Sequence, residues 1–379
     1  MEYRQFEKLG INASLLGLGT MRLPILNGEN KNVDEQQSIE MIRHAIDHGI
    51  NYIDTAYPYH NGNSEIVVGK ALKDGYRDKV YIADKMPLWL TKSEKDVYKV
   101  FDTQLERLGV ECIDFYLVHN VTEAIWKRAL KYNIFDFLHK KKAEGKIKYI
   151  GFSFHGAGDF FKEVMDYYNW DFCQIQFNYI DTNYQAGLAG LKYAGEKNIP
   201  VIVMEPLKGG RLAMTPPDSI QALWDSHSLK LSPAAWGLKW IANFPEVKVI
   251  LSGMSNMEQL KENINTLKDM KPNSLSSSDL EFMEQIKTAY DKLIKINCST
   301  CNYCIPCPSK VNIPKIFSFY NEMHLYSTHD MIRKDFNLWV GPKQRPSACT
   351  ECGICEEQCP QGLPIREWLK EAGSVFEKK

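Results

Sequence analysis

The sequence has no excess of charge of either sign and no long apolar run. Its 379 residues contain 46 Lys and Arg against 47 Asp and Glu, a formal net charge of -1. This balance provides no positive field that would attract nucleic acid or anionic lipid. No apolar run approaches the roughly 18 residues that span a bilayer, and the N-terminus lacks a basic segment followed by an apolar core. We therefore expect a cytoplasmic protein that acts on small molecules, with neither nucleic acid nor membrane as a partner.

Cysteine is scarce over most of the chain. Only Cys112 and Cys173 precede position 298, and the other eight of the ten cysteines follow it. A disulfide framework would be spread along a small secreted chain, whereas cysteines gathered at Cys-x-x-Cys spacing indicate a metal site. We expect Cys112 and Cys173 to be small core residues, because free cysteine commonly behaves as a buried hydrophobe.

Short apolar runs rich in β-branched and aromatic residues alternate with segments of helical spacing, of which 38–49, 96–109 and 135–145 are examples. Alternating strands and helices call for a parallel sheet, and eight such units in about 250 residues match an α/β fold of the (β/α)8 TIM barrel type. A doubly wound sheet is the alternative, but no Gly-x-Gly-x-x-Gly follows the first run. The expected strands are 15–19, 51–55, 80–84, 114–119, 148–153, 172–178, 200–205 and 247–253.

Four polar or ionisable residues lie at or just after the ends of the second, third and fourth of these strands. Asp54 ends the second with Tyr59 five residues later, Lys85 ends the third and His119 ends the fourth. Any one of them alone would more often be solvated than catalytic. In a barrel, however, the chemistry lies at the C-terminal ends of the strands. The four together therefore predict an active site.

The segments that carry these residues are GINYIDTAYPYHNGNSEIVVGKAL, VYIADK, YLVHN and, further on, GKIKYIGFS. They resemble successive signatures of the aldo-keto reductase superfamily over roughly residues 1–270. The resemblance implies a barrel domain at 1–292 that transfers hydride between NAD(P)H and a carbonyl or alcohol. It implies that Tyr59 is the general acid, that Lys85 supplies positive charge, that Asp54 holds and neutralises Lys85, and that His119 orients or polarises the carbonyl. The nearby ammonium should lower the pKa of Tyr59.

The resemblance also implies how the nucleotide is bound. Phe154 stands where the family commonly has Asn, and Met204 stands where an aromatic residue commonly stacks on the nicotinamide. Because of these departures, an alternative is a redox-responsive or electron-transfer protein that uses the barrel mainly to bind nucleotide. The implied contacts are Thr20, Met21, Ser153, Gln174 and Met204 at the nicotinamide, Pro206, Leu207, Lys208, Gly209 and Arg211 near the pyrophosphate, and Gly253, Ser255, Gln259 and Asn263 around the adenosine end.

The adenosine segment, 253–263, lacks the Lys or Arg that commonly contacts a 2′-phosphate, and offers Asn256 and Gln259 instead. Without the bidentate contacts that arginine makes to phosphate, a preference for NADP loses its usual basis. We expect weak discrimination or a preference for NADH.

Two cysteine runs, CSTCNYCIPCP from Cys298 and CTECGICEEQCP from Cys349, occupy the last part of the chain. The second matches the bacterial ferredoxin run Cys-x2-Cys-x2-Cys-x3-Cys-Pro, in which the fourth cysteine ligates the other cluster, and the first differs only at its end. The resemblance implies a ferredoxin-like domain at 293–379 with two [4Fe-4S] clusters. Helical spacing at Ile313, Ile316, Phe317 and Tyr320 predicts that this domain is α-helical. The implied ligands are Cys298, Cys301, Cys304 and Cys359 for one cluster, and Cys349, Cys352, Cys355 and Cys307 for the other.

Two zinc sites are the alternative for these cysteines, although zinc sites more often pair two Cys-x-x-Cys units. Enzymes that connect hydride with single electrons usually place a flavin between them, and no flavin motif is visible. One cluster would suffice to brace the domain, whereas two that exchange ligands form a short relay. We therefore expect redox-active clusters that exchange electrons with an external ferredoxin-like carrier.

Overall fold

The computed structural model describes residues 1–298 and 302–377. By contacts the chain divides into two compact units, one formed by Met1–Gly209 with Ala234–Ser277 and the other by Gly210–Pro233 with Ser278–Lys379. The second unit thus contains an excursion from the middle of the sequence. The domain boundary expected at 292/293 stays a prediction.

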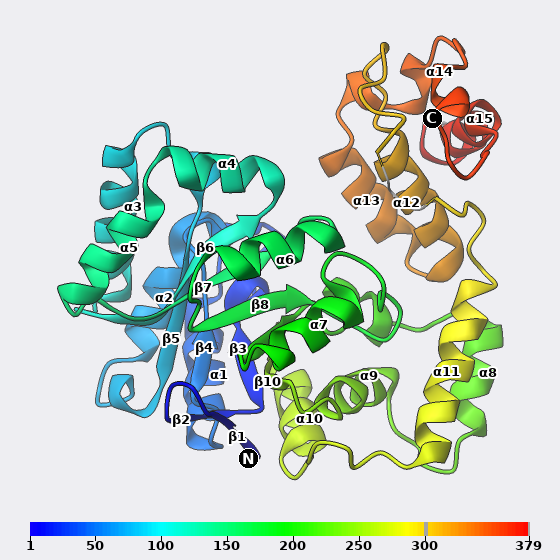
Figure 1. Cartoon of the computed structure of the whole chain (residues 1–379). Helices are drawn as coiled ribbons and strands as arrows, with labels where there is room; N and C mark the ends of the chain where they lie inside the picture. Colours follow the sequence, from blue (N-terminus) through cyan, green and yellow to red (C-terminus); the bar gives the residue numbers. More distant parts are fainter. Residues whose placement is uncertain (299–301, 378–379) are drawn as a thin grey trace. The chain divides into compact units, whose positions relative to one another are not determined.

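The first unit is a closed barrel of eight parallel strands in the order β10-β3-β4-β5-β6-β7-β8-β9 (Figure 1). All eight strands coincide with the expected runs, so the prediction of a TIM barrel is confirmed. Their bounds are β3 Leu16–Gly19, β4 Tyr52–Asp54, β5 Tyr81–Met86, β6 Ile113–Val121, β7 Ile147–Phe154, β8 Phe172–Gln176, β9 Val201–Met204 and β10 Val247–Ser252.

Helices cover the outside of the barrel and pack on it through aliphatic and aromatic side chains. The helix expected at 96–109 is α3, which begins after a capping box at Ser93 and ends at Gly109, whose φ of 64° suits a helix C-terminus. The helices of this unit are α1 Glu35–Asp47, α2 Asn63–Ala71, α3 Glu94–Leu108, α4 Glu123–Lys131, α5 Ile134–Ala143, α6 Gly158–Tyr167, α7 Gly187–Glu196, α9 Pro233–Ala242 and α10 Met257–Leu267.

A hairpin that the sequence analysis did not predict precedes the barrel. Strands β1 Tyr3–Phe6 and β2 Ile11–Ser14 pair antiparallel. Phe6 and Ala13 join the apolar cluster inside the barrel, which includes Tyr52 and Phe115, and the rings of Phe6 and Phe115 meet at 5.8 Å. The hairpin therefore completes the apolar part of the barrel interior.

The second unit is helical, which confirms the predicted helical character of the C-terminal region. Helix α12 buries Ile313, Ile316, Phe317 and Tyr320, the residues whose spacing predicted it. The helices are α8 Asp218–Ser226, α11 Ser277–Asp291, α12 Ile313–Leu325, α13 His329–Trp339, α14 Ile354–Glu357 and α15 Ile365–Phe376. Within this unit α12 packs against both α13 and α15.

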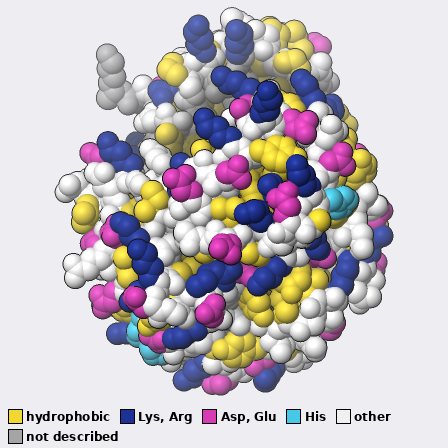
Figure 2. Space-filling model, turned by 90° about the vertical axis from the view of Figure 1, so that its left-hand side faces the viewer, with side chains coloured by type: hydrophobic (Ala, Val, Ile, Leu, Met, Phe, Trp, Pro, Cys, Tyr) yellow, Lys and Arg dark blue, Asp and Glu magenta, His cyan; other side chains and the backbone are white. Residues whose placement is uncertain are grey.

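Charged side chains of both signs are interspersed on the face that Figure 2 presents, in agreement with the net charge of -1. Among the helices of the described ranges, none is both long and apolar enough to cross a membrane.

Candidate active site and cluster sites

Alternation along the strands explains why the four predicted catalytic residues meet. Tyr52, Ala83 and Leu117 belong to the apolar cluster inside the barrel. Because side chains two residues apart on a strand share a face, Asp54, Lys85 and His119 point to the same interior, one step nearer the C-terminal ends. Tyr59 arrives from the turn Tyr59–Gly62 that follows β4.

Lys85 is the centre of this group and has a fully buried side chain. Its Nζ donates to Asp54 Oδ1 at 2.6 Å and to the carbonyl oxygen of Thr55 at 2.7 Å, and it lies 3.4 Å from the hydroxyl of Tyr59. Although burial opposes it, the carboxylate of Asp54 raises the pKa of Lys85, with Tyr59 contributing. The ammonium therefore stays charged inside the barrel.

His119 completes the group as a neutral imidazole. Its ring lies 6.2 Å from the ring of Tyr59 and 4.8 Å from that of Trp89, between ring centroids. Burial lowers the pKa of His119 well below its usual value, and Lys85 and His155 lower it further. His119 Nδ1 has no hydrogen-bond partner among the described residues. The ring can thus offer a neutral polar contact to a bound molecule.

The predicted net shift of the Tyr59 pKa requires a correction, although the contribution of Lys85 has the predicted direction. Lys85 does favour the phenolate, but burial of the phenol outweighs it and Asp54 adds to the rise, so the pKa of Tyr59 is raised above its usual value. The net direction is opposite to the prediction for the protein without nucleotide. Tyr59 therefore holds its proton at neutral pH.

Two neighbours of the group were not predicted. Trp89 comes from the turn Leu88–Leu90 after β5, and His155 follows β7. Burial lowers the pKa of His155 to about 4, with Lys85 contributing to the fall. The one signal in the sequence was their position after barrel strands, which they share with many inert residues.

A second pair of acids, Asp84 and Glu65, lies beside Lys85, and both are fully buried. The Lys85 N–H donates to Asp84 Oδ1 at 2.7 Å, and Arg107 Nη1 donates to Glu65 Oε2 at 2.7 Å. Within the described part of the chain, the remaining oxygens, Asp84 Oδ2 and Glu65 Oε1, have no donor. Burial raises the pKa of Asp84 well above its usual value, and its contact with Glu65 raises it further. One proton shared between the two carboxyl groups satisfies both oxygens.

The residues expected at the nicotinamide lie at the C-terminal ends of four strands. Thr20 donates to the carbonyl oxygen of Asp54 at 2.9 Å, next to the exposed Met21. The backbone N–H of Asn120 donates to Ser153 Oγ at 2.8 Å. Gln174 Nε2 lies 3.3 Å from Met204 Sδ, and its buried Oε1 has no donor among the described residues. That oxygen suits an amide N–H, so these residues fit a nicotinamide carboxamide.

The loop expected at the pyrophosphate, Pro206–Arg211, has both its cations engaged. Lys208 Nζ lies 2.7 Å from a carboxylate oxygen of Asp181, in the first unit. Arg211 Nη2 lies 2.8 Å from Asp335 and 3.0 Å from Glu322, in the second unit. Pro206 is buried, whereas Leu207 and Gly209 are partly exposed.

At the expected adenosine end, polar side chains make hydrogen bonds at the start of α10. Asn256 caps the helix by accepting from the N–H of Gln259 at 2.9 Å, and Gln259 Oε1 accepts from the N–H of Ser255 at 2.8 Å. Asn263 Nδ2 donates to Ser252 Oγ at 3.0 Å, where Ser252 ends β10 just before Gly253.

Arg22 is a further cation that the sequence analysis missed. It is exposed, and its stem carbons would lie 3.4–3.6 Å from a Cβ atom at Gly253. It therefore extends over the expected adenosine segment. Its position immediately after Met21 was the signal that could have found it.

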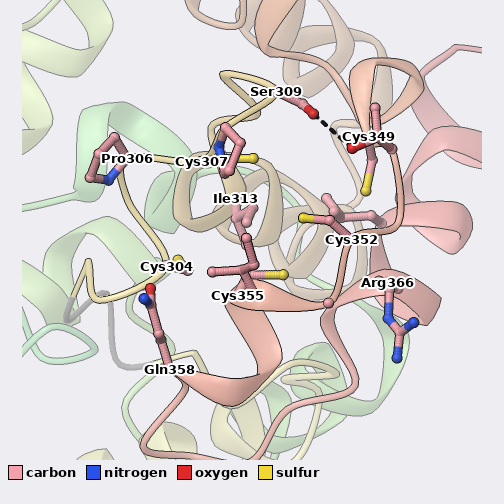
Figure 3. A pocket seen from close by; sticks show the side chains of 15 residues that line it. Cys304, Pro306, Cys307, Ser309, Ile313, Cys349, Cys352, Cys355, Gln358 and Arg366 are labelled. Carbon is pink, nitrogen blue, oxygen red and sulfur yellow. Dashed lines mark hydrogen bonds between the residues drawn. The ribbon is translucent and has the colours of Figure 1, made fainter.

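The cysteines of the second unit line two hollows. Figure 3 shows Cys307 from the first run turned toward Cys349, Cys352 and Cys355 from the second, and these four line one cavity together with Cys304 and the apolar Ile313. A second cavity is lined by Cys298, Cys304 and Cys359. Each cavity thus has cysteines of both runs, while the assignment of single cysteines to one cluster or the other stays a prediction, and Cys301 lies outside the described residues.

The chemistry of these hollows fits iron-sulfur clusters. Burial raises the pKa of the Cys355 thiol, and Glu356 and Cys349 raise it further. A four-iron cluster takes one thiolate at each of four separate irons. Sulfur atoms spread around a hollow satisfy that need.

The shared proton predicts a pH-dependent effect of Asp84→Asn on stability. The amide can still accept from Lys85 and donate to Glu65, but it cannot ionise. An acid whose pKa is raised by folding adds stability that is full below its unfolded pKa, about 3.9, and is lost as pH rises through the folded pKa. The free energy of unfolding of the wild type should therefore fall relative to Asp84→Asn as pH rises above about 4. Urea unfolding at several pH values measures this difference.

Asp84→Ala is the matched control, because it leaves the Lys85 N–H and the Glu65 oxygen without partners. It should cost about 1–3 kcal/mol. Parallel pH dependences of the wild type and Asp84→Asn would show that Asp84 is already ionised in the folded protein.

Two family models match successive parts of the sequence. Residues 15–288 match the model of the aldo/keto reductase family, and residues 297–363 match that of the 4Fe-4S dicluster domain. An NADH-specific methylglyoxal reductase of Escherichia coli is 28% identical over 327 residues, which cover 74% of this chain and 97% of that protein. A probable aldo-keto reductase of Glycine max is 36% identical over 152 residues, 38% of this chain and 42% of that protein.

Solved structures share the fold of the first unit. The aldo-keto reductase AKR11C1 from Bacillus halodurans in its holo form has a TM-score of 0.62 at 24% identity, and covers 76% of this chain and 96% of its own. An aldo-keto reductase from Klebsiella pneumoniae in complex with NADPH has a TM-score of 0.61 at 21% identity, with the same coverage of 76% and 96%. Because the family model matches well over half of the sequence, from residue 15 to residue 288, this chain belongs to the aldo/keto reductase family.

Proposed function

We propose that the protein is an NAD(P)H-dependent oxidoreductase that interconverts a small carbonyl compound and its alcohol, and that two [4Fe-4S] clusters in the second unit transfer electrons. The observation that carries the proposal is the buried ammonium of Lys85, which lies 2.6 Å from Asp54 and 3.4 Å from the hydroxyl of Tyr59. A charged lysine is rarely buried without a function or a partner, and here it has a carboxylate on one side and an acid on the other.

The four residues divide the work of carbonyl reduction. Tyr59 Oη donates its proton to the carbonyl oxygen, and Lys85 stabilises the phenolate that remains. Asp54 keeps Lys85 charged and aimed at Tyr59. The neutral His119 orients the same oxygen without competing for the proton. A bound nicotinamide supplies the hydride.

The nicotinamide end of the nucleotide is proposed to lie against Thr20, Met21, Ser153, Gln174 and Met204. Support comes from Gln174 Oε1, a buried oxygen with no donor among the described residues, and from the family match. The relatives' names support the reaction class too, since one is a methylglyoxal reductase.

The clusters are proposed to use Cys298, Cys301, Cys304 and Cys359 for one and Cys307, Cys349, Cys352 and Cys355 for the other. We further propose that they exchange electrons with a ferredoxin-like carrier outside the chain. Two clusters with exchanged ligands lie close together, which favours a relay over a mere brace.

Tyr59→Phe keeps the ring and removes the proton donor. We expect carbonyl reduction to fall by about 100-fold to 10,000-fold while nucleotide binding survives. Steady-state kinetics with a panel of small aldehydes and ketones, together with nucleotide titration, measure both effects. Unchanged turnover would favour the alternative in which the barrel only binds nucleotide.

NADH should bind at least as tightly as NADPH, because Asn256 and Gln259 are already used at the start of α10. The relative with an NADH-specific name is consistent with this preference. Fluorescence titration with both nucleotides measures the two dissociation constants. A strong preference for NADPH that disappears in Arg22→Gln would contradict the prediction and identify Arg22 as the contact to the 2′-phosphate.

Anaerobically purified protein should contain about eight iron and about eight sulfide per chain. Cys307→Ser and Cys355→Ser should each lower both to about four, and the double variant no further, because the two residues serve one cluster. Cys112→Ser, outside both runs, is the control and should leave the iron content unchanged. Zinc in place of iron, with no visible absorption, would exclude the iron-sulfur proposal.

A further inference from the structure

The turn that carries Tyr59 has a strained backbone. The three residues after Tyr59 are His60, Asn61 and Gly62, with φ of 51°, 57° and 93°. Only glycine adopts such left-handed angles without a steric penalty, so His60 and Asn61 are strained. Strained residues persist where the surrounding structure over-determines them, and they gather at functional sites. The position of Tyr59 therefore depends on the contacts that hold this turn.

One guanidinium contacts the chain on both sides of Tyr59. Arg107 lies in the last turn of α3, and its Cζ is 4.3 Å from the ring centroid of Tyr57. Its Nη1 donates to the carbonyl oxygen of Tyr57 at 3.4 Å and to Glu65 Oε2 at 2.7 Å. A Cβ atom at Gly62 would lie 2.8 Å from the same nitrogen. Arg107 thus supports the segment that contains the proposed acid.

The ion pair with Glu65 determines where this guanidinium lies. Glu65 is fully buried in the first turn of α2, and the side chain of Arg107 is 23% exposed. The planar arginine fork can pair with a carboxylate while its face lies on an aromatic ring. Helices α2 and α3 pack against each other. The guanidinium is therefore a fixed support for the turn rather than a mobile surface charge.

The same helix also contacts the backbone of the ammonium-bearing residue. Gln104 lies on α3 one turn before Arg107, and its Nε2 donates to the carbonyl oxygen of Lys85 at 3.0 Å. Gln104 Oε1 accepts from the hydroxyl of Tyr116 at 2.6 Å, so this side chain is held at both ends. One rigid helix thus contacts both the strand of Lys85 and the turn of Tyr59.

We propose that Arg107 is a positioning residue, which holds the turn Tyr59–Gly62 so that the hydroxyl of Tyr59 stays within reach of Lys85 Nζ. The inference rests on the proposed role of Tyr59 as proton donor and adds to it a residue outside the group of four. Without the guanidinium, the strained backbone of the turn relaxes and the hydroxyl is displaced. The chemical step then slows, whereas the nucleotide, which is proposed to lie against other residues, binds as before.

A double variant tests this role without leaving a buried charge. Arg107→Met alone would deprive the buried Glu65 of its cation, so it is combined with Glu65→Gln, whose amide can still donate to Asp84. In the full-length protein, Arg107→Met/Glu65→Gln should lower kcat for carbonyl reduction by about 10-fold to 100-fold, because small displacements of a reacting group are costly. The dissociation constant for NADH, measured by fluorescence titration, should not change.

Arg43 provides a matched control away from this turn. It also donates to a backbone carbonyl oxygen, that of Ala71 at 3.0 Å, and pairs with Asp74 at 2.7 Å. Its Cζ lies 4.8 Å from the ring centroid of Tyr76. Ala71 is the last residue of α2, whereas the turn of Tyr59 precedes the first. Arg43→Met/Asp74→Asn should therefore have the kcat of the wild type.

Both double variants are then repeated in a Tyr59→Phe background, which separates positioning from general destabilisation. A residue that acts through the Tyr59 hydroxyl has nothing left to position there, so Arg107→Met/Glu65→Gln should cause no further loss of kcat. A merely structural role would lower kcat by the same factor in both backgrounds. Circular dichroism before the assay verifies that each variant is folded.

The outcomes separate the inference from the proposed function. Wild-type kcat in Arg107→Met/Glu65→Gln, or an equal loss in both backgrounds, would overturn the positioning role. Weaker NADH binding with unchanged kcat would overturn it too. In each case a low kcat of Tyr59→Phe leaves the proposed reaction intact. Unchanged turnover in Tyr59→Phe itself would overturn the proposed acid together with the inference.

Discussion

The ion pair between Lys85 and Asp54 inside the barrel is the constraint on which the site depends. Removing either partner leaves a buried charge without compensation, at a cost of about 3–5 kcal/mol. The pair forms because β4 and β5 are neighbours: Asp54 lies opposite Ala83, and Lys85, two residues further along β5 on the same face, reaches back to it. Everything at the mouth of the barrel is arranged around this ammonium. The hydroxyl of Tyr59 lies 3.4 Å from Lys85 Nζ, and the charge of Lys85 helps to keep His119 neutral. The backbone N–H of Lys85 donates to Asp84.

The eight barrel strands could be predicted because parallel strands are buried on both faces and appear as short apolar runs. Their ends then located the four candidate catalytic residues. The hairpin β1–β2 escaped prediction because burial in it does not follow hydrophobicity: in β1 the charged Arg4 is buried and the aromatic Tyr3 is exposed. Similarly, α12 was predictable from its own apolar spacing, since no distant partner is needed to recognise a helical stripe.

The ion pairs could not be predicted from the sequence. Lys208 and Arg211 looked alike in a loop of six residues, yet one is paired with Asp181 and the other with Asp335, which lies 124 positions further along the chain. The pair of Asp84 and Glu65 is of the same kind, because no local pattern announces that two carboxyl groups meet. The predicted direction of the net pKa shift of Tyr59 was wrong for a related reason. The distance to Lys85 could be guessed, but the extent of desolvation depends on the whole surrounding wall.

The hairpin at the start of the chain has a consequence for proton traffic. Phe6 and Ala13 belong to the same apolar cluster as Tyr52 and Phe115, and Tyr52 precedes Asp54 by two residues on β4. This end of the barrel interior is therefore apolar, whereas the polar groups lie toward the C-terminal ends of the strands. In the reaction that we propose, the proton of Tyr59 is then replaced from the C-terminal mouth of the barrel, the side from which the substrate also enters.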